Sequence, residues 1–408
     1  MISIPVIITL AVMLLLALIT PLISPFFRKV EPEYGDADEE RDNAENPLPP
    51  VSIVLAEHDC SHYLKKVLPL YLSQDYGADY QVVVVIDQSD TESEDYLKLL
   101  CEEHKQLYYT LLPDSSRYIS RKKMGMTLGI RAAKYEWLLF ADVNCAPSSD
   151  KWLEAVARHC DDNHNMVLGL TPYEEETPAY FRFEQMRTML YHLHSAQKGM
   201  AFSTNQSLIM MRRSEFFDKR GFQGNLEFAR AEFEFLVNKF AAEDKCAIAI
   251  EPEARMTQME PSEEYIKMKR LFAIDALKGL SRSSGFKSLY KTDLYSIHVF
   301  NFLTLIVMVC GALLAYVQMT GIGKSQLDSL LPNVFMQYDG LALLGGAALA
   351  WLISLLERMY VYSNKLSYFD SVSPLAAIIM EWTISIRNTA LRISYIFSDK
   401  TDFITHKL

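Results

Sequence analysis

The sequence predicts an α/β domain with a mainly parallel central sheet, joined to N-terminal and C-terminal transmembrane helices. Between residues 51 and 142, strand signals alternate with helix signals, which is typical of a parallel sheet covered by helices on both faces. Long apolar segments lie outside this region, and they explain why 50% of the 408 residues are hydrophobic while 22% are charged. The composition therefore indicates a soluble part and a membrane part in one chain.

Four strands are expected in the soluble part. The runs VSIVLA and QVVVVID are apolar at nearly every position, as is typical of strands buried on both faces. The predicted strands are 51–56, 81–87, 107–112 and 136–142. The helix patterns between them are 62–72, 93–104 with Ser93 as a plausible N-cap, and 122–133. Because ligands of such sheets bind beyond the carboxyl ends of the strands, the polar residues there are the first candidates for a site.

Three apolar segments are candidates for membrane helices. They lie at 2–27, at about 297–317 and at 341–356, and the last could begin near Val334. The first could instead be a cleavable signal peptide. Its charges, Arg28 and Lys29, follow the apolar run rather than precede it, which favours an uncleaved anchor. The third is short, so a buried core helix stays open as an alternative.

Basic residues beside these segments predict their orientation, because cytoplasmic loops are enriched in Lys and Arg. The loop between the second and third segments contains one basic residue, Lys324. The basic residues on the opposite sides are Arg28, Lys29, Lys287, Lys291, Arg358 and Lys365. We therefore expect the N-terminus outside, and residues 28–296 and the C-terminus in the cytoplasm. In the tail, the apolar stretch 374–386 is interrupted by Glu381 and is interpreted as an interfacial helix.

Charge and cysteine content exclude two classes of protein. The net charge of −11 argues against a nucleic-acid-binding protein, which normally has a basic surface. Residues 31–50 contain eight acidic and one basic residue, carry −7 of that charge, and are expected to be a flexible linker. The six cysteines form no CxxC pair, so neither structural zinc nor a disulfide framework is expected.

These observations divide the chain into five regions. The predicted regions are an anchor at 1–28, an acidic linker at 29–50, a cytoplasmic α/β domain at 51–290, two transmembrane helices at 291–357 and a cytoplasmic tail at 358–408.

Polar residues at the predicted strand ends are candidates for chemistry. Asp142 and Asn144 end the fourth strand, at positions i and i+2, and both side chains can face one cleft. Oxygen ligands of this kind suit Mg²⁺ or Mn²⁺ holding a diphosphate. A strand-end turn is the alternative, because Asp and Asn favour turns. Asp87 ends the second strand, where a turn is again the simpler interpretation.

Two further pairs lie on predicted helices. Lys122 and Lys123 begin a helix beside the strand ends and could contact phosphates, although a solvated helix start is equally ordinary. Glu232 and Glu234 lie in RAEFEFLVNKF, which alone reads as an amphipathic segment. A glutamate placed over the cleft could instead act as a general base towards a hydroxyl nucleophile.

Taken together, residues 48–296 and the flanking apolar helices resemble the family 2 glycosyltransferases of the GT-A fold, especially the membrane-anchored bacterial type. The order of the motifs carries the resemblance. A first strand and helix end in SQDY, and VVVVIDQSDTES, SRKKMGMTLGIRAAKYE and FADVNCAPSSDKW follow. The last of these resembles the DxD motif of the family, before Pro and Trp. An acidic motif in RAEFEF and the QxxRW-like segment KMKRL come next.

The resemblance implies a role for each matching residue. Those implied to contact the nucleotide are Ala56, Asp59, Asp87, Ser89, Lys122 and Lys123. Asp142 and Asn144 would be the metal and diphosphate ligands, with Mg²⁺ or Mn²⁺ as the cofactor. Glu234, or failing that Glu232, would be the catalytic base. Lys267 and Arg270 would contact the diphosphate or the acceptor.

The resemblance also implies an activity and its partners. The chain would transfer a sugar, with inversion, from a nucleotide-diphosphate sugar to a hydroxyl of a glycan or lipid-linked acceptor. A place in cell-envelope or extracellular polysaccharide synthesis follows, with the lipid bilayer as a partner and no nucleic acid. The location would be the bacterial inner (cytoplasmic) membrane, with the catalytic domain facing the cytoplasm.

Departures from the family motifs keep alternatives open. Asn144 replaces the last Asp of DxD, Phe233 interrupts the ED motif, KMKRL lacks the Gln and Trp of QxxRW, and the acid usual after strand one is replaced near Asp59 and Cys60. The segment QSLIM also lacks the usual Gly and Asn. A catalytically degenerate scaffold of a membrane glycan-assembly complex is the main alternative. A synthase that exports its product is a weaker one, because it needs more membrane spans and an intact QxxRW.

Overall fold

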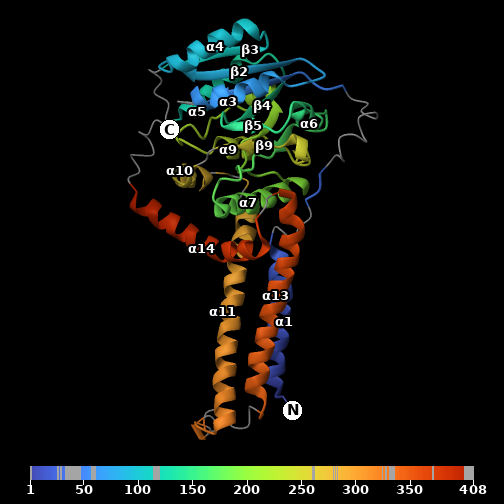
Figure 1. Ribbon diagram of the computed structural model, residues 1–408, viewed down its shortest axis with the longest axis vertical. Coiled ribbons are helices and arrows are strands. Elements are labelled where there is room, and N and C mark those ends of the chain that lie inside the picture. The colour runs from blue at the N-terminus through green and yellow to red at the C-terminus, as the bar shows by residue number, and fades with distance from the viewer. Residues whose placement is uncertain are drawn as a thin grey trace. The chain divides into compact units, whose positions relative to one another are not determined.

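A computed structural model shows two compact units. One comprises Met1–Lys29 and Ser284–Thr389, and the other comprises Val30–Ser283 and Ala390–Leu408. Figure 1 shows the helices and strands of both units along the chain. The structure describes residues 2–24, 27, 30–32, 47–56, 61–113, 120–259, 262–278, 280, 282, 284–323, 325–326, 329, 336–369 and 372–398. Asp59 and most of the acidic linker lie outside these described residues.

The second unit contains a seven-stranded sheet of order β3-β2-β1-β4-β7-β6-β8. Its strands are β1 (Val51–Ala56), β2 (Tyr80–Asp87), β3 (Leu107–Leu112), β4 (Trp137–Ala141), β6 (Met166–Gly169), β7 (Ile209–Arg212) and β8 (Cys246–Ala249). β1 pairs in parallel with β2 and β4, and β2 with β3. Among the described strands of this sheet, β7 alone runs antiparallel to its neighbours β4 and β6. The predicted α/β fold with a mainly parallel sheet is confirmed.

Helices alternate with the strands as the sequence indicated. They are α3 (Ser61–Leu72), α4 (Thr91–Glu103), α5 (Arg121–Ala132), α6 (Trp152–Ala157), α7 (Ala179–Gln197), α8 (Arg213–Asp218), α9 (Glu232–Phe240) and α10 (Glu263–Lys278). The prediction of Ser93 as the N-cap of the second helix is wrong. Asp90 caps α4, since its carboxylate accepts a hydrogen bond from the Ser93 backbone N–H at 3.0 Å. The negative charge of Asp90 also complements the positive N-terminal end of the helix dipole.

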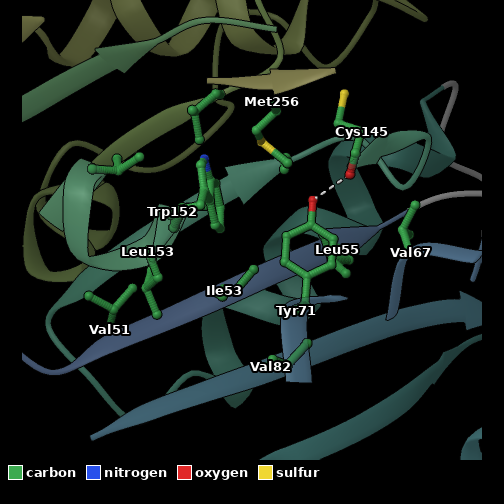
Figure 2. Close-up of a cluster of buried hydrophobic side chains, with 14 of the residues drawn as sticks. Val51, Ile53, Leu55, Val67, Tyr71, Val82, Cys145, Trp152, Leu153 and Met256 are labelled. Carbon is green, nitrogen blue, oxygen red and sulfur yellow. Dashed lines mark hydrogen bonds between the residues drawn. The ribbon is translucent and has the colours of Figure 1, made fainter. Parts of the chain in front are cut away.

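A buried aromatic pair fixes the chain just beyond β4 (Figure 2). Tyr71 of α3 and Trp152 of α6 are both fully buried and meet edge to face, with ring centroids 5.7 Å apart. The Tyr71 hydroxyl donates to the Cys145 carbonyl at 2.9 Å, and Trp152 Nε1 donates to the Ala254 carbonyl at 3.1 Å. Buried aromatic residues whose polar atoms have partners stabilise a single arrangement. Here they hold β5 (Cys145–Pro147), which pairs with β9 (Met256–Gln258).

The first unit is helical. It contains α1 (Ile4–Ile23), α11 (Ser284–Thr320), α13 (Asp339–Phe369) and most of α14 (Pro374–Phe397). Three helical segments are long and apolar enough to cross a membrane, namely Ile4–Ile23, Tyr295–Thr320 and Asp339–Asn364. The third candidate span is longer than the predicted 341–356, and α14 extends well beyond the predicted 374–386. The orientation of these helices stays a prediction.

Small residues allow α11 and α13 to approach closely. A Cβ placed on Gly340 would lie 2.2 Å from the backbone nitrogen of Ala315, and one on Gly311 would lie 2.7 Å from the nitrogen of Leu344. Close backbone approach at small residues is the usual basis of helix packing in lipid, where burying apolar surface gains little. Arg358 of α13 and Glu381 of α14 form a buried ion pair at 2.6 Å, which ties α14 to the same unit.

Candidate active site

Asp142 lies directly after β4, at the carboxyl edge of the parallel strands, and it is 2% exposed. Its carboxylate collects three partners from distant parts of the chain. Oδ1 forms an ion pair with Lys122 Nζ of α5, and Oδ2 accepts a hydrogen bond of 2.6 Å from the Ser207 hydroxyl. Lys269 Nζ of α10 lies 3.7 Å from Oδ2. Two ammonium groups therefore share one carboxylate at this edge.

The charges in this cluster stabilise one another. Burial pushes the pKa of Asp142 upward, but the ammonium groups of Lys122 and Lys269 and the hydrogen bonds from Lys122 and Ser207 outweigh it and hold the pKa well below its ordinary value. Burial pushes the pKa of Lys269 downward, and the opposite charge of Asp142 outweighs it and raises that pKa. The carboxylate and the Lys269 ammonium are therefore charged at neutral pH.

Two glycines bring the start of α5 to this edge. A Cβ on Gly129 would lie 2.4 Å from Val54 Cγ1, and one on Gly125 would lie 3.2 Å from the Ala56 Cβ. α5 therefore lies against β1 and β2 more closely than a larger residue would allow. Ala56, which the sequence placed among the nucleotide contacts, is buried in this packing beneath α5.

Lys123 has a different environment from that of its neighbour. Its ammonium donates to the carbonyls of Asn225 at 2.9 Å, Phe228 at 2.5 Å and Arg230 at 3.1 Å. Burial lowers its pKa to about 8, against the opposing charges of Glu232 and Glu234. Lys123 therefore holds the loop that precedes α9, whereas the sequence placed it beside the nucleotide.

Both candidate bases lie in the first turn of α9. The helix follows Ala231, which has a left-handed backbone with φ of 69°. Glu232 is 4% exposed, and its Oε1 has no hydrogen-bond partner among the described residues. Burial raises the pKa of Glu234; the charges of Glu232 and Asp142 act in the same direction, and Lys269 opposes them. Glu234 is thus a stronger base than an ordinary glutamate, in the electrostatic field of the Asp142 cluster.

Asp87 ends β2, where it is 2% exposed. Arg121, the first residue of α5, donates from Nε to Asp87 Oδ1 at 2.9 Å. Ser89 follows in an exposed turn. The end of β2 therefore carries an ion pair at the same edge of the sheet as the cluster at β4. Arg121 is a residue that the sequence did not single out.

The KMKRL segment forms part of α10, and each of its three cationic side chains has a different partner. Lys267 is exposed and pairs with Glu263 one turn earlier, at 2.5 Å. Arg270 pairs with Glu184 of α7 at 2.7 Å. The cation that reaches Asp142 is Lys269, which the sequence did not single out. Ser207 was also missed; it lies just before β7 in the QSLIM segment, which stands out in the sequence only by lacking the usual Gly and Asn.

Asn144 completes the segment that resembles DxD. Its side-chain nitrogen lies 3.4 Å from the Met259 carbonyl oxygen, and its backbone carbonyl accepts a hydrogen bond of 2.8 Å from the Met259 N–H. Among the described residues, no group of three or more His, Cys, Asp or Glu side chains could hold a metal ion. One neutral amide and one carboxylate already bound by Lys122 and Ser207 do not fit a divalent cation in this arrangement. The Mg²⁺ or Mn²⁺ site stays a prediction from the sequence.

Comparison with solved structures supports the fold. The mannosyltransferase PcManGT from Pyrobaculum calidifontis, solved in complex with GDP-Man and Mn²⁺, is 14% identical, with a TM-score of 0.50 over 85% of this chain and 97% of that one. S. aureus TarS 1–349 is 15% identical, with a TM-score of 0.41 over 83% of this chain and 91% of that one. At such identities the likeness to PcManGT shows the fold alone. No curated protein matches the chain.

A family model matches the part of the chain that carries most of the site. The model, described as glycosyl transferase family 2, covers residues 52–221 and so includes Asp87, Lys122, Asp142 and Ser207. Lys269 and the two glutamates of α9 lie beyond it. Residues 52–221 therefore match the glycosyl transferase family 2 model, and they belong to an α/β domain with a GT-A-like fold.

Proposed function

We propose that the protein is an inverting glycosyltransferase, which moves a sugar from a nucleotide-diphosphate donor to a hydroxyl group of a glycan or lipid-linked acceptor. The observation that carries the proposal is the convergence of Lys122, Lys269 and Asp142 at the carboxyl edge of the sheet, within the electrostatic reach of Glu234. The family 2 match over residues 52–221 supports nucleotide-sugar transfer as the class of reaction.

The proposed reaction assigns one role to each charged group. Glu234 accepts the proton of the acceptor hydroxyl, whose oxygen attacks the anomeric carbon of the sugar. The bond from that carbon to the diphosphate breaks on the opposite side, which inverts the configuration. Negative charge grows on the departing diphosphate, where the ammonium groups of Lys122 and Lys269 stabilise it. A raised pKa makes Glu234 suited to take the proton.

The remaining expectations belong to the same proposal. Asp87, with Arg121 beside it, would contact the nucleotide portion of the donor. The three apolar helices support an enzyme at a membrane, which we propose to be the bacterial inner membrane, with the domain in the cytoplasm and a role in polysaccharide synthesis.

The test uses the full chain purified in detergent. It is supplied with a panel of nucleotide-diphosphate sugars, and release of the nucleoside diphosphate is measured. We expect release from at least one donor, and a large loss of turnover in Glu234→Gln. Glu243→Gln is the matched control, because Glu243 is an exposed glutamate in a loop. Failure with every donor, together with no nucleotide binding, refutes the proposal, whereas binding without turnover favours the degenerate scaffold.

A further inference from the structure

We propose that Lys122 and Lys269 bind the diphosphate of the donor directly, so that the protein binds a nucleoside diphosphate without a divalent cation. This inference rests on the proposed function, because it concerns the same site. It goes beyond that function by naming the protein groups that replace the cation, one of which lies outside the matched family segment.

The side chains at the end of β4 are a poor set of ligands for a divalent cation. A divalent cation needs several oxygen ligands, usually carboxylates, carbonyls or water. Here Asp142 is the one carboxylate of the DVN triplet, and Asn144 is neutral. Both Asp142 oxygens already have partners, and the Lys122 ammonium at Oδ1 repels a divalent cation that approaches the same carboxylate. The arrangement favours an anion over a cation.

Two ammonium groups from different helices meet at the Asp142 carboxylate, where they can bind one anion between them. The Lys269 ammonium stands 3.7 Å from Oδ2, beyond hydrogen-bond distance, and its side chain is 28% exposed. Lys269 can therefore turn to a phosphate oxygen without breaking a strong hydrogen bond.

The position of Lys122 also supports direct binding of the diphosphate. Its side chain is 7% exposed, and its ammonium lies 5.6 Å from the centre of the ring of Phe233, the residue between Glu232 and Glu234 in the sequence. A ring face beside an ammonium group stabilises the charge without neutralising it. Lys122 therefore lies between Asp142, where the diphosphate is proposed to bind, and the first turn of α9, which carries Glu234. A diphosphate that binds both lysines would lie at the carboxyl edge of the sheet, where ligands of such folds bind.

The experiment measures nucleotide binding by the full chain in detergent, by calorimetry, with UDP, GDP, ADP and CDP as the probes. Each is titrated after treatment with EDTA and again with added Mn²⁺. We expect at least one probe to bind in EDTA, with an affinity within about threefold of that in Mn²⁺. Lys122→Met and Lys269→Met should each weaken binding in EDTA at least tenfold. Lys278→Met is the matched control, because Lys278 is an exposed lysine at the end of the same helix as Lys269.

Two further variants separate this inference from a cation site. Asp142→Asn removes the carboxylate that competes with the diphosphate for both lysines, so nucleotide binding in EDTA should become tighter. If Asp142 were instead a ligand of a divalent cation, the same variant would lose that ligand and nucleotide binding would fail. Asn144→Asp adds a carboxylate and should make binding depend on Mn²⁺; this variant and Lys269→Met keep the test available if Asp142→Asn does not fold. Binding of the unmodified protein that requires Mn²⁺ overturns the inference and leaves the proposed function standing. No binding under either condition overturns both.

Discussion

The close packing of α5 on the sheet can be tested at Gly129. An added Cβ would lie 2.4 Å from Val54 Cγ1 and 3.3 Å from Val85 Cγ2, whereas ordinary contacts begin at 3.4 Å. Val54 is 1% exposed and β-branched, so it has little freedom to rotate away. In Gly129→Ala, α5 therefore has to move outward by roughly the missing ångström, and Lys122 at its start moves with it.

The expected loss of stability follows from two opposing effects. Overpacking costs about 1–3 kcal/mol, and a 2.4 Å contact with a buried β-branched side chain belongs to the upper part of that range, about 2–3 kcal/mol. Alanine is better than glycine in a helix by about 1 kcal/mol, which offsets part of the cost. The net loss of about 1–2 kcal/mol should lower the Tm of the domain by about 2–8 °C. Nucleotide affinity should fall as well, because Lys122 shifts away from Asp142.

The assay is a thermal-shift measurement on the detergent-purified chain, followed by nucleotide titration. Gly125→Ala is the matched control in the same helix. Its Cβ would meet the Ala56 Cβ at 3.2 Å, so a shift of a few tenths of an ångström is enough. Its Tm should stay within about 2 °C of the unmodified protein. A Tm for Gly129→Ala equal to or above that of the unmodified protein would refute the packing argument.

Three other predictions concern the proposed base Glu234, the hydrogen bond from Ser207 to Asp142, and the packing of α11 on α13. Burial raises the pKa of Glu234, and the carboxylate form is the base; turnover should therefore fall as the pH drops through a value above the ordinary glutamate value of about 4.3. In a pH–rate profile of kcat, that acidic limb should be absent from the residual activity of Glu234→Gln, which should be about 10²–10⁴-fold lower. Ser207→Ala removes a 2.6 Å hydrogen bond to the buried Asp142 carboxylate and should cost about 1.5–3 kcal/mol, measured as a lower Tm; an unchanged Tm would contradict that contact. Gly340→Leu places a side chain against the backbone of Ala315 and should separate α11 from α13, which gel filtration in detergent would report as aggregation; a sharp monodisperse peak at the position of the unmodified protein would contradict it.

The sheet was the most predictable part of the molecule. The strands 51–56 and 107–112 agree with β1 and β3 to the residue, and 81–87 differs from β2 by one. The reason is physical: β1 and β2 are buried on both faces, so their sequences are continuous apolar runs with sharp polar ends. The N-cap of α4 was misplaced because Asp90 and Ser93 are both good capping residues, and the choice depends on the backbone angles of the turn.

The site was predictable only where its residues are local to a strand end or a helix start. Asp142 and Lys122 were found because each lies beside a recognisable element. Ser207 is 65 residues from Asp142 along the chain, and tertiary folding alone brings them together. Lys269 stands next to Arg270, and no sequence pattern decides which of two neighbouring cations faces inward when the helix is polar on several sides.

Lys122 and Lys123 are adjacent on α5, but they bind different parts of the site. Successive side chains on an α-helix point about 100° apart, so two neighbouring lysines cannot both face Asp142. Lys122 pairs with that carboxylate, whereas Lys123 binds three carbonyls of the loop that leads into α9. α5 thereby contacts the group proposed to hold the leaving diphosphate and the segment that carries the proposed base. A displacement of α5 should consequently weaken donor binding and proton transfer together, and a variant that loses one while keeping the other would show that α5 does not link them.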